Sequence, residues 1–383
     1  SQVLAEVVGF KSDRMLLMPY QNMNGLAPGS FVRNTGRRLR LQVGDFLRGR
    51  IINAMGKPID GLEPFPEGDS YYVDSPYINP LTRPPIRERV DFGVRAIDST
   101  LTIGKGQRIG IFAGSGVGKS TLMGMIAKNV KTDINVIALV GERGREVLEF
   151  VQKDLGEEGM RRSVLVVATS DQPAMLRMKC PSVATAIAEY FRDQGKDVLL
   201  MMDSLTRFAM AQREIGLAVG EPPVARGYTP SIYAELPKLL ERSGNFERGS
   251  ITGVYTVLVE GDDTNEPIAD TVRGILDGHI VLSRKLANAN HFPAIDVSAS
   301  ISRLMVEIVS PKHRELASKL RDILSVYEKN EDLLSIGAYK AGTNPRLDYA
   351  ISKIDQINAF LMQGINESFS YDESLHQLES ILQ

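Results

Sequence analysis

Continuous apolar runs, separated by segments with a helical pattern, dominate the chain from about residue 108. Continuous rather than alternating hydrophobicity is typical of parallel strands that are covered on both faces, and the segments between them supply the helical crossovers. We therefore predict an α/β core built on a mainly parallel sheet. The runs are Ile109–Ala113, Val136–Val140, Val164–Ala168, Val198–Met202 and Val254–Val259.

The pattern changes on both sides of this core. Residues Val3–Val32 alternate short β-prone runs with turn residues, which predicts part of a small β-domain, too short to close by itself. Beyond about Val309 the strand-like runs stop, and apolar residues recur at spacings of four, three and four, as on one helix face. We expect a helical C-terminal domain there. The recurring positions are Leu316, Leu320, Ile323 and Tyr327.

A proline-rich band, Gly56–Pro85, precedes the core and holds seven of the 19 prolines. Few long apolar runs occur in it, so we predict an irregular, extended segment wrapped on a core. Its apolar and aromatic side chains should be buried against that core. They are Tyr71, Tyr72, Val73, Tyr77 and Ile78.

Composition narrows the classes of protein. The 383 residues suit two or three domains, and 43% hydrophobic with 24% charged residues is typical of a soluble globular protein. A net charge of -2 gives no global field that would draw the chain onto nucleic acid. The apolar runs are too short to span a bilayer.

The single cysteine and the first residues bear on the compartment. Cys180 cannot form an internal disulfide, which suits a reducing cytosol, and we interpret it as a packing residue. Residues Ser1–Phe10 show no export signal. Because the first residue is not methionine, we expect a processed or trimmed chain.

A glycine-rich loop follows the first core strand. Residues Ile109–Thr121 read Ile-Gly-Ile-Phe-Ala-Gly-Ser-Gly-Val-Gly-Lys-Ser-Thr: a buried strand, a loop and a helix start. Glycines allow tight turns that aim main-chain N–H groups at phosphate oxygens, while Lys119 reaches the β and γ phosphates and the Ser120 hydroxyl ligates magnesium. Ala113 stands where the usual pattern has glycine, which is tolerable if its φ is negative. The alternative is a chance Lys-Ser pair after a glycine-rich turn.

Two carboxylates at strand ends could turn binding into hydrolysis. Asp203 follows Val198–Met202 and would face the magnesium ion; alternatively, it only caps the next helix. Glu142 follows Val136–Val140 and could orient the attacking water, with Arg143 or Glu146 fixing its position. The alternative for Glu142 is a solvated charged loop.

Phosphoryl transfer also needs positive charge on the outer phosphate oxygens. Arg303 ends the stretch Asp296-Val-Ser-Ala-Ser-Ile-Ser-Arg303, which we place outside the loop's own half of the sheet. From these residues alone, a structural salt bridge is favoured over catalysis.

Taken together, these motifs resemble the flagellar protein-export ATPase, a member of the type III secretion ATPases, which are related to the catalytic β subunit of rotary ATP synthases. The resemblance covers nearly the whole chain, with its blocks in the family's order. The blocks are Ala113–Thr121, Gly141–Glu146, Leu199–Arg207, Tyr228–Leu239, Glu260–Asp263, Phe292–Asp296 and Ser300–Arg303. Ile336-Gly-Ala-Tyr-Lys340 resembles the flagellar rather than the injectisome branch.

The resemblance implies a role for each candidate. It implies ATP and Mg²⁺ as ligands, with Glu142 as the catalytic carboxylate and Arg303 as the arginine that a neighbouring subunit inserts at the γ-phosphate. The phosphate-binding residues would be Ala113, Gly114, Ser115, Gly116, Val117, Gly118, Lys119, Ser120 and Thr121, and the magnesium-side residues Ser120, Asp203 and Glu146. Phe292 and Phe360 match aromatic positions that line the adenine pocket, although both could instead be core residues.

The same resemblance implies three regions: a partial N-terminal β-barrel over residues 1–36, a RecA-like ATPase domain over 37–308, and a helical domain over 309–383. The first region is too short for the family's barrel and preceding helical segment, so we expect the piece that binds a peripheral stalk protein to be absent. Glu328-Lys-Asn-Glu-Asp332 carries only three acids, fewer than the acidic loop of the synthase β subunit, which favours export over synthesis.

The expected assembly is a homohexamer in the cytoplasm, at the inner face of the inner membrane. Its expected partners are a peripheral stalk protein, a central coiled-coil stalk protein that the C-terminal helices contact, export substrates with their chaperones, and the export gate; nucleic acid is not among them. The alternatives are an injectisome ATPase, a hexameric RNA translocase, which Gly104-Lys-Gly-Gln-Arg108 would also suit, and a non-catalytic nucleotide-binding subunit. The C-terminal helices could also pack only on their own subunit.

Overall fold

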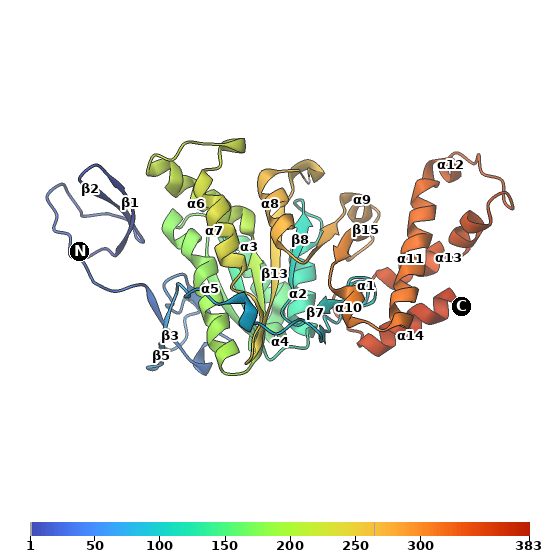
Figure 1. The fold of residues 1–383 in the computed structure, drawn as a ribbon, viewed down its shortest axis with the longest axis horizontal. Coiled ribbons are helices and arrows are strands. Elements are labelled where there is room, and N and C mark those ends of the chain that lie inside the picture. The colour runs from blue at the N-terminus through green and yellow to red at the C-terminus, as the bar shows by residue number, and fades with distance from the viewer. Residues whose placement is uncertain (1, 264) are drawn as a thin grey trace.

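The computed structural model describes residues 2–263 and 265–383. A mixed sheet forms its centre, with the N-terminal hairpin at one end of an elongated molecule and the C-terminal helices at the other (Figure 1). The predicted α/β architecture is thereby confirmed. Among the residues that the structure describes, no helix is both long and apolar enough to cross a membrane.

The central sheet has the strand order β15-β14-β8-β13-β11-β9-β10-β4, with the short β12 paired to β13. Neighbours from β14 to β4 along this order are parallel, whereas the edge strand β15 runs antiparallel to β14. All five predicted runs are strands of this sheet. The strands are β4 (Ile51–Asn53), β8 (Arg108–Ala113), β9 (Ile134–Val140), β10 (Ser163–Ala168), β11 (Asp197–Asp203), β12 (Gly244–Asn245), β13 (Ser250–Leu258), β14 (Gly278–Leu282) and β15 (Ile295–Ser302).

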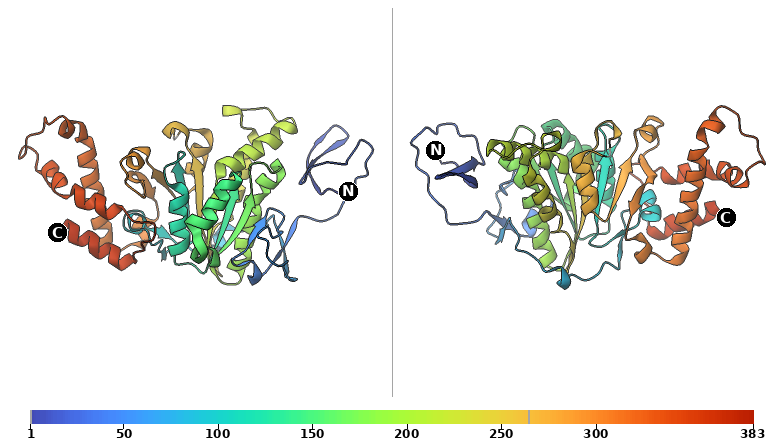
Figure 2. Two further views of the ribbon diagram at one scale, coloured as in Figure 1. Left: turned by 180° about the vertical axis from the view of Figure 1, so that it is seen from behind. Right: turned by 45° about the horizontal axis from the view of Figure 1, so that its top comes forward.

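Helices cover both faces of the sheet, which explains the continuous apolar strands. In β9, Val136 and Ala138 enter one core, packed under α5 to α8, while Ile137 and Leu139 enter the other, under α1, α2 and the C-terminal helices. Figure 2 shows the two layers from behind and from above. The helices are α1 (Arg95–Thr100), α2 (Lys119–Asn129), α3 (Gly144–Glu149), a π-helix (Phe150–Leu155), α4 (Gly156–Arg161), α5 (Ala174–Asp193), α6 (Leu205–Ala218), α7 (Pro230–Leu240), α8 (Pro267–Ile275), α9 (Arg284–Asn288) and α10 (Met305–Ile308).

The C-terminal region is helical, as predicted. Its long helix buries Leu316, Leu320 and Ile323 on one face, and Ser310 caps its start by accepting a hydrogen bond from the His313 N–H. The helices are α11 (Pro311–Lys329), α12 (Glu331–Ser335), α13 (Pro345–Leu361) and α14 (Tyr371–Leu382).

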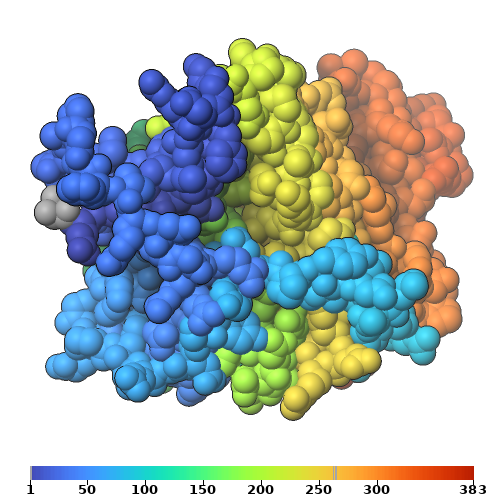
Figure 3. Space-filling view, turned by 60° about the vertical axis from the view of Figure 1, so that its left-hand side comes forward, coloured from blue at the N-terminus to red at the C-terminus, as the bar shows by residue number. Residues whose placement is uncertain are grey.

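The N-terminal strands form a two-stranded antiparallel hairpin of β1 (Ala5–Lys11) and β2 (Arg14–Pro19). After an extended segment, β3 (Arg40–Val43) pairs with β5 (Asp69–Tyr72), and β6 (Arg89–Val90) pairs with β7 (Ile103–Gly104). The proline-rich segment runs along the outside of the molecule in light blue and cyan (Figure 3).

One expectation for this segment is wrong. Val73 is fully buried, but Tyr77 is 85% exposed and Tyr72 is 38% exposed. The guanidinium groups of Arg38 and Arg40 stack on the Tyr72 ring instead, so cations rather than a core cover it.

Candidate active site

The glycine-rich loop joins the end of β8 to the start of α2, as predicted. Gly116 and Gly118 have φ values of 72° and 90°, which side chains rarely adopt, so glycine is required at both positions. Ala113 is the last residue of β8 and has no positive φ, so its methyl group is accommodated. Main-chain N–H groups of such a loop, at a helix start, bind phosphate.

Lys119 lies in this loop beside the predicted metal-side acid. Its Nζ is 2.5 Å from Oδ1 of Asp203, and the two side chains are 13% and 6% exposed. Burial opposes the lysine charge, but the carboxylates of Asp203 and Glu142 overcome it and raise the Lys119 pKa. The ammonium group is therefore fully charged and positioned at the phosphate loop.

Asp203 does not cap the following helix. Ser204 is the N-cap of α6, and its hydroxyl accepts a hydrogen bond from the Arg207 N–H. The Asp203 carboxylate instead accepts a hydrogen bond from the Thr256 hydroxyl on β13 at 2.8 Å. The capping alternative is thus excluded, and the carboxylate is held toward Lys119.

Glu142 follows β9 at the same edge of the sheet and is half-buried. Burial, the like charge of Asp203 and a hydrogen bond with Glu146 raise the pKa of Glu142 to about 8. The same hydrogen bond lowers the pKa of Glu146, whose Oε2 also accepts from the Arg143 N–H at 3.3 Å. The raised pKa favours the protonated form of Glu142 at neutral pH, in which it shares its proton with Glu146.

Arg303 lies at the amino edge of the sheet, where the parallel strands begin, opposite the carboxyl edge that holds the phosphate loop. Its N–H donates to the carbonyl of Asp277, and the N–H of Asp277 donates to that of Arg108, the first residue of β8. The phosphate loop begins at the other end of β8, roughly 17 Å away at about 3.3 Å per residue. Arg303 therefore cannot reach the phosphate loop of its own chain.

Two expectations about Arg303 need correction. Because β15 is two strands from β8, Arg303 lies in the same half of the sheet as the loop. It differs from the loop in lying at the amino rather than the carboxyl ends of the parallel strands. Nor does Arg303 form a salt bridge with a described residue: its side chain donates only one long hydrogen bond, at 3.5 Å, to the carbonyl of Arg273. The first error arose because β15 pairs with β14, two strands from β8; its antiparallel direction sets the edge at which Arg303 lies.

Comparison with known proteins identifies the family. A model of the ATP synthase alpha/beta family, nucleotide-binding domain, matches residues 93–302, and one of the T3SS EscN ATPase C-terminal domain matches residues 309–380. This chain belongs to the ATP synthase alpha/beta family. Within the family it is an ATP-hydrolysing enzyme of the flagellar and type III secretion class, which confirms the predicted resemblance.

Several relatives support this placement. The chain is 60% identical to the Flagellum-specific ATP synthase of Bacillus subtilis, over 99% of this chain and 86% of that one. It is 50% identical to the protein of the same name in Salmonella typhimurium, over 99% and 85%. Among solved structures, the assembled ATPase EscN from the enteropathogenic E. coli type III secretion system superimposes with a TM-score of 0.95 at 47% identity, covering 100% of this chain and 93% of that one.

The predicted adenine-side aromatics of this ATPase differ in exposure. Phe292 is 39% exposed and lies against the loop, since a Cβ built on Gly118 would be 3.3 Å from its Cδ1. Phe360 is only 3% exposed in α13, under the guanidinium of Arg95. The N–H of Gln363, near the end of α13, donates to the Phe292 carbonyl and ties the two regions together. The open aromatic surface beside the phosphate loop is therefore that of Phe292.

The residues beside Lys119 suit magnesium. Ser120, whose side chain is a hydroxyl, is the second residue of α2, and the Asp203 carboxylate is held at Lys119, so oxygen donors of the kind that Mg²⁺ prefers are present. Among the described residues, no cluster of three or more His, Cys, Asp or Glu could hold a metal alone. Nucleotide phosphates would thus supply part of the coordination, as in other phosphate-loop enzymes.

Sequence reasoning missed three residues that shape this site. Thr256 orients Asp203, Arg284 donates from Nη2 to the Ser115 carbonyl at 2.8 Å, and Arg207 packs on Gly141, directly before Glu142. Arg207 lies within a recognised block, four residues after Asp203, so its motif could have drawn attention. Nothing in the sequence places Thr256 or Arg284 beside the loop.

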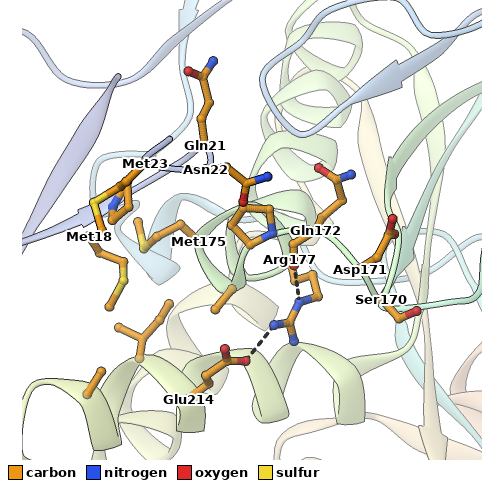
Figure 4. A pocket seen from close by; sticks show the side chains of 15 residues that line it. Met18, Gln21, Asn22, Met23, Ser170, Asp171, Gln172, Met175, Arg177 and Glu214 are labelled. Carbon is orange, nitrogen blue, oxygen red and sulfur yellow. Dashed lines mark hydrogen bonds and ion pairs between the residues drawn. The ribbon is translucent and has the colours of Figure 1, made fainter. Parts of the chain in front are cut away.

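A separate hollow of about 520 Å³ lies between the N-terminal segment and helices α5 and α6 (Figure 4). Met18, Met23 and Met175 line one part of it, and the ion pair of Arg177 with Glu214, 2.6 Å between Nη2 and Oε2, lines another. None of the predicted catalytic residues lines this hollow, so it is separate from the predicted nucleotide site at the loop.

Proposed function

We propose that this chain is the ATPase of a flagellar type III protein-export apparatus and that it works as a homohexameric ring with ATP bound between neighbouring copies. The observation that carries this proposal is the division of the site: the phosphate loop lies at one edge of the sheet and Arg303 at the other. A heterologous, head-to-tail contact between identical chains brings the two edges together and closes a ring.

Lys119 and the main-chain amides of residues 114–118 hold the phosphates. Ser120, Asp203 and Glu146 would hold the magnesium ion, which when bound would neutralise charge on the phosphate oxygens. The phosphates then compete with Asp203 for the Lys119 ammonium group, and Thr256 keeps the carboxylate in place as the lysine moves.

Glu142 orients the attacking water, whose oxygen bonds to the γ-phosphorus as the bond to the leaving ADP oxygen breaks, and the ionised Glu142 carboxylate takes the proton that the water loses. In this role Glu142 accepts a hydrogen bond from the water, so it must first lose the proton it shares with Glu146. Arg143, next in the chain, fixes the position of this loop. The Arg303 guanidinium of the neighbouring copy stabilises charge on the transferring group, typically worth roughly 10³ to 10⁵ in rate.

Phe292 stacks on the adenine, and its position against Gly118 supports this role. Phe360 contributes to the same pocket. It lies three residues before Gln363, whose N–H is bonded to the Phe292 carbonyl. The low exposure of Phe360 makes this a smaller contribution.

The export role rests on the relatives. Flagellum-specific relatives reach 60% identity, whereas the Type 3 secretion system ATPase of Xanthomonas euvesicatoria is 50% identical, which favours the flagellar over the injectisome branch. We place the ring in the cytoplasm at the inner membrane, where it acts on export substrates, their chaperones and the export gate. A peripheral stalk protein and a central coiled-coil stalk are its further partners; EscN was solved in complex with its central stalk EscO.

The ATPase rate per chain, measured against protein concentration, tests the shared site. We expect the specific rate to rise with concentration as rings form, with or without polycytidine RNA. A specific rate that is constant down to nanomolar protein would contradict the ring, and stimulation by RNA at low salt would favour a translocase.

A further inference from the structure

One arginine beside the phosphate loop has no part in the mechanism above. Arg284 is the first residue of α9, and its Nη2 donates to the main-chain carbonyl of Ser115 at 2.8 Å. The next residue, Lys285, points elsewhere and forms an ion pair with Glu331 in the C-terminal region. Two adjacent cations on one short helix thus have different partners.

The backbone at Arg284 is held firmly beside the loop. Strand β14 runs parallel to β8, with Val281 opposite Phe112, so its end lies at the same edge as the phosphate loop. Ser283 caps α9 through its hydroxyl, and its N–H donates to the carbonyl of Ala294 at 2.8 Å. Arg284 therefore starts from a fixed point on the rigid sheet.

The contact determines the direction of one loop amide. In a trans peptide the C=O and N–H point to opposite sides, so the carbonyl of Ser115 and the N–H of Gly116 are directed apart. Gly116 has a φ of 72°, and no side chain restricts its rotation. A bond that holds the Ser115 carbonyl on the outside therefore holds the Gly116 N–H on the phosphate side.

We infer that Arg284 is a positioning residue that clamps the phosphate loop in its binding conformation by holding the Ser115 carbonyl. It acts through the loop and does not touch the phosphates. The inference deepens the proposed function, because it names what keeps the loop ready before ATP arrives. Preorganised donors cost less to order when the ligand binds.

Gly114 provides a second, independent observation. Its φ is not in the left-handed region, so its backbone does not require glycine. A Cβ built there would be 2.8 Å from Nη2 of Arg284 and 3.3 Å from the carbonyl oxygen of Val259. A side chain at position 114 would therefore take the space that the guanidinium occupies and displace it from the loop.

The two features predict a specific non-additivity. Gly114→Ala pushes the guanidinium off the loop, and Arg284→Ala removes it, so both changes delete the same contact. Calorimetry with Mg²⁺ and a non-hydrolysable ATP analogue should show each variant binding about 3- to 10-fold more weakly, the effect of one hydrogen bond. The double variant should bind about as weakly as the weaker single variant, and Lys285→Ala, the matched control, as tightly as the starting protein.

Hydrogen exchange adds a readout that needs no nucleotide. In Arg284→Ala, but not in Lys285→Ala, we expect the amides of residues 114–118 to exchange faster in the nucleotide-free protein. The clamp is overturned if the losses of analogue affinity in the two single variants multiply in the double variant. It is also overturned if the amides of residues 114–118 exchange at the same rate in Arg284→Ala as in the starting protein. The affinity of the starting protein for the ATP analogue tests the proposed function separately, because the exchange measurement uses no nucleotide.

Discussion

The two edges of the central sheet differ in how their candidate catalytic side chains are paired. At the carboxyl edge, Lys119, Glu142 and Asp203 are buried or half-buried and bonded to one another or to neighbours. At the amino edge, Arg303 has a single long hydrogen bond to a described residue. The candidate residues at the carboxyl edge are paired, whereas Arg303 at the amino edge has no carboxylate partner in the part of the chain that the structure describes.

This difference separates the groups that one chain arranges by itself from the one that it leaves unpaired. The carboxyl edge is organised without a ligand, because Asp203 is bonded to Lys119 and Glu142 shares a proton with Glu146. In the proposed ring, the Arg303 of one copy acts only at the site of its neighbour. A single copy would then hold the phosphate-binding residues but lack this arginine, so assembly would control the rate.

The largest expected effect comes from removing the isolated cation. Arg303→Ala should lower turnover by roughly 10³ to 10⁵ while leaving the affinity for a non-hydrolysable ATP analogue nearly unchanged, because the guanidinium acts on the transition state of a neighbouring site. Steady-state rates and calorimetry measure the two quantities. Arg314→Ala, an exposed arginine bonded to the carbonyl of Val306, is the control and should keep its rate.

The next largest effect should follow from the carboxyl edge. Glu142→Gln should reduce turnover by about 10² to 10⁴, the usual contribution of a group that positions or deprotonates a nucleophile. Analogue binding should persist, since at neutral pH the uncharged glutamine replaces a mainly protonated, uncharged carboxyl group. Glu149→Gln, on the exposed side of α3 in an ion pair with Arg145, should leave turnover intact. Equal losses in both variants would remove Glu142 from the mechanism.

A smaller change tests the support of Asp203. Thr256→Val keeps the shape but deletes the hydroxyl that donates to the carboxylate, and it should weaken Mg-ATP use about tenfold in kcat/KM. Thr252→Val changes the same strand at a hydroxyl that accepts from the Gly106 N–H, so it should lower stability without this effect. If Thr256→Val keeps the full kcat/KM, the hydroxyl does not position Asp203.

The smallest expected effect is a shift in the pH dependence of kcat/KM. Because Glu142 must be ionised to accept from water and its pKa is about 8, kcat/KM should rise with pH up to about 8 in the starting protein. Glu146→Gln removes a carboxylate that raises this pKa, so the rise should move to lower pH. A rise that stays in place, or moves to higher pH, would show that Glu146 does not share the proton.

Local features of the site could be predicted from the sequence because they follow one strand at a time. The runs ending at Ala113, Val140 and Met202 predict three strands whose carboxyl ends meet, and hence the gathering of Lys119, Glu142 and Asp203. Long-range features could not. The direction of β15, which decides the edge where Arg303 lies, depends on a pairing with β14 that no local pattern encodes.

Contacts between distant strands explain the remaining misses. Arg284 is 169 residues from Ser115, and Thr256 is 53 residues from Asp203, so only the folded sheet brings each pair together. The wrong burial of Tyr77 has a different cause. Apolar composition predicted a covered side chain, but this extended segment leaves its own residues open wherever it does not pack on the core.

Mixing two inactive variants tests most directly whether the site is divided between chains. Arg303→Ala protein keeps an intact phosphate loop, and Lys119→Ala protein keeps an intact Arg303. In an equal random mixture about a quarter of the interfaces join the two intact halves, so up to about a quarter of the wild-type rate should return. No recovery on mixing, with both variants folded and assembled, or a normal rate in Arg303→Ala alone, would contradict the account.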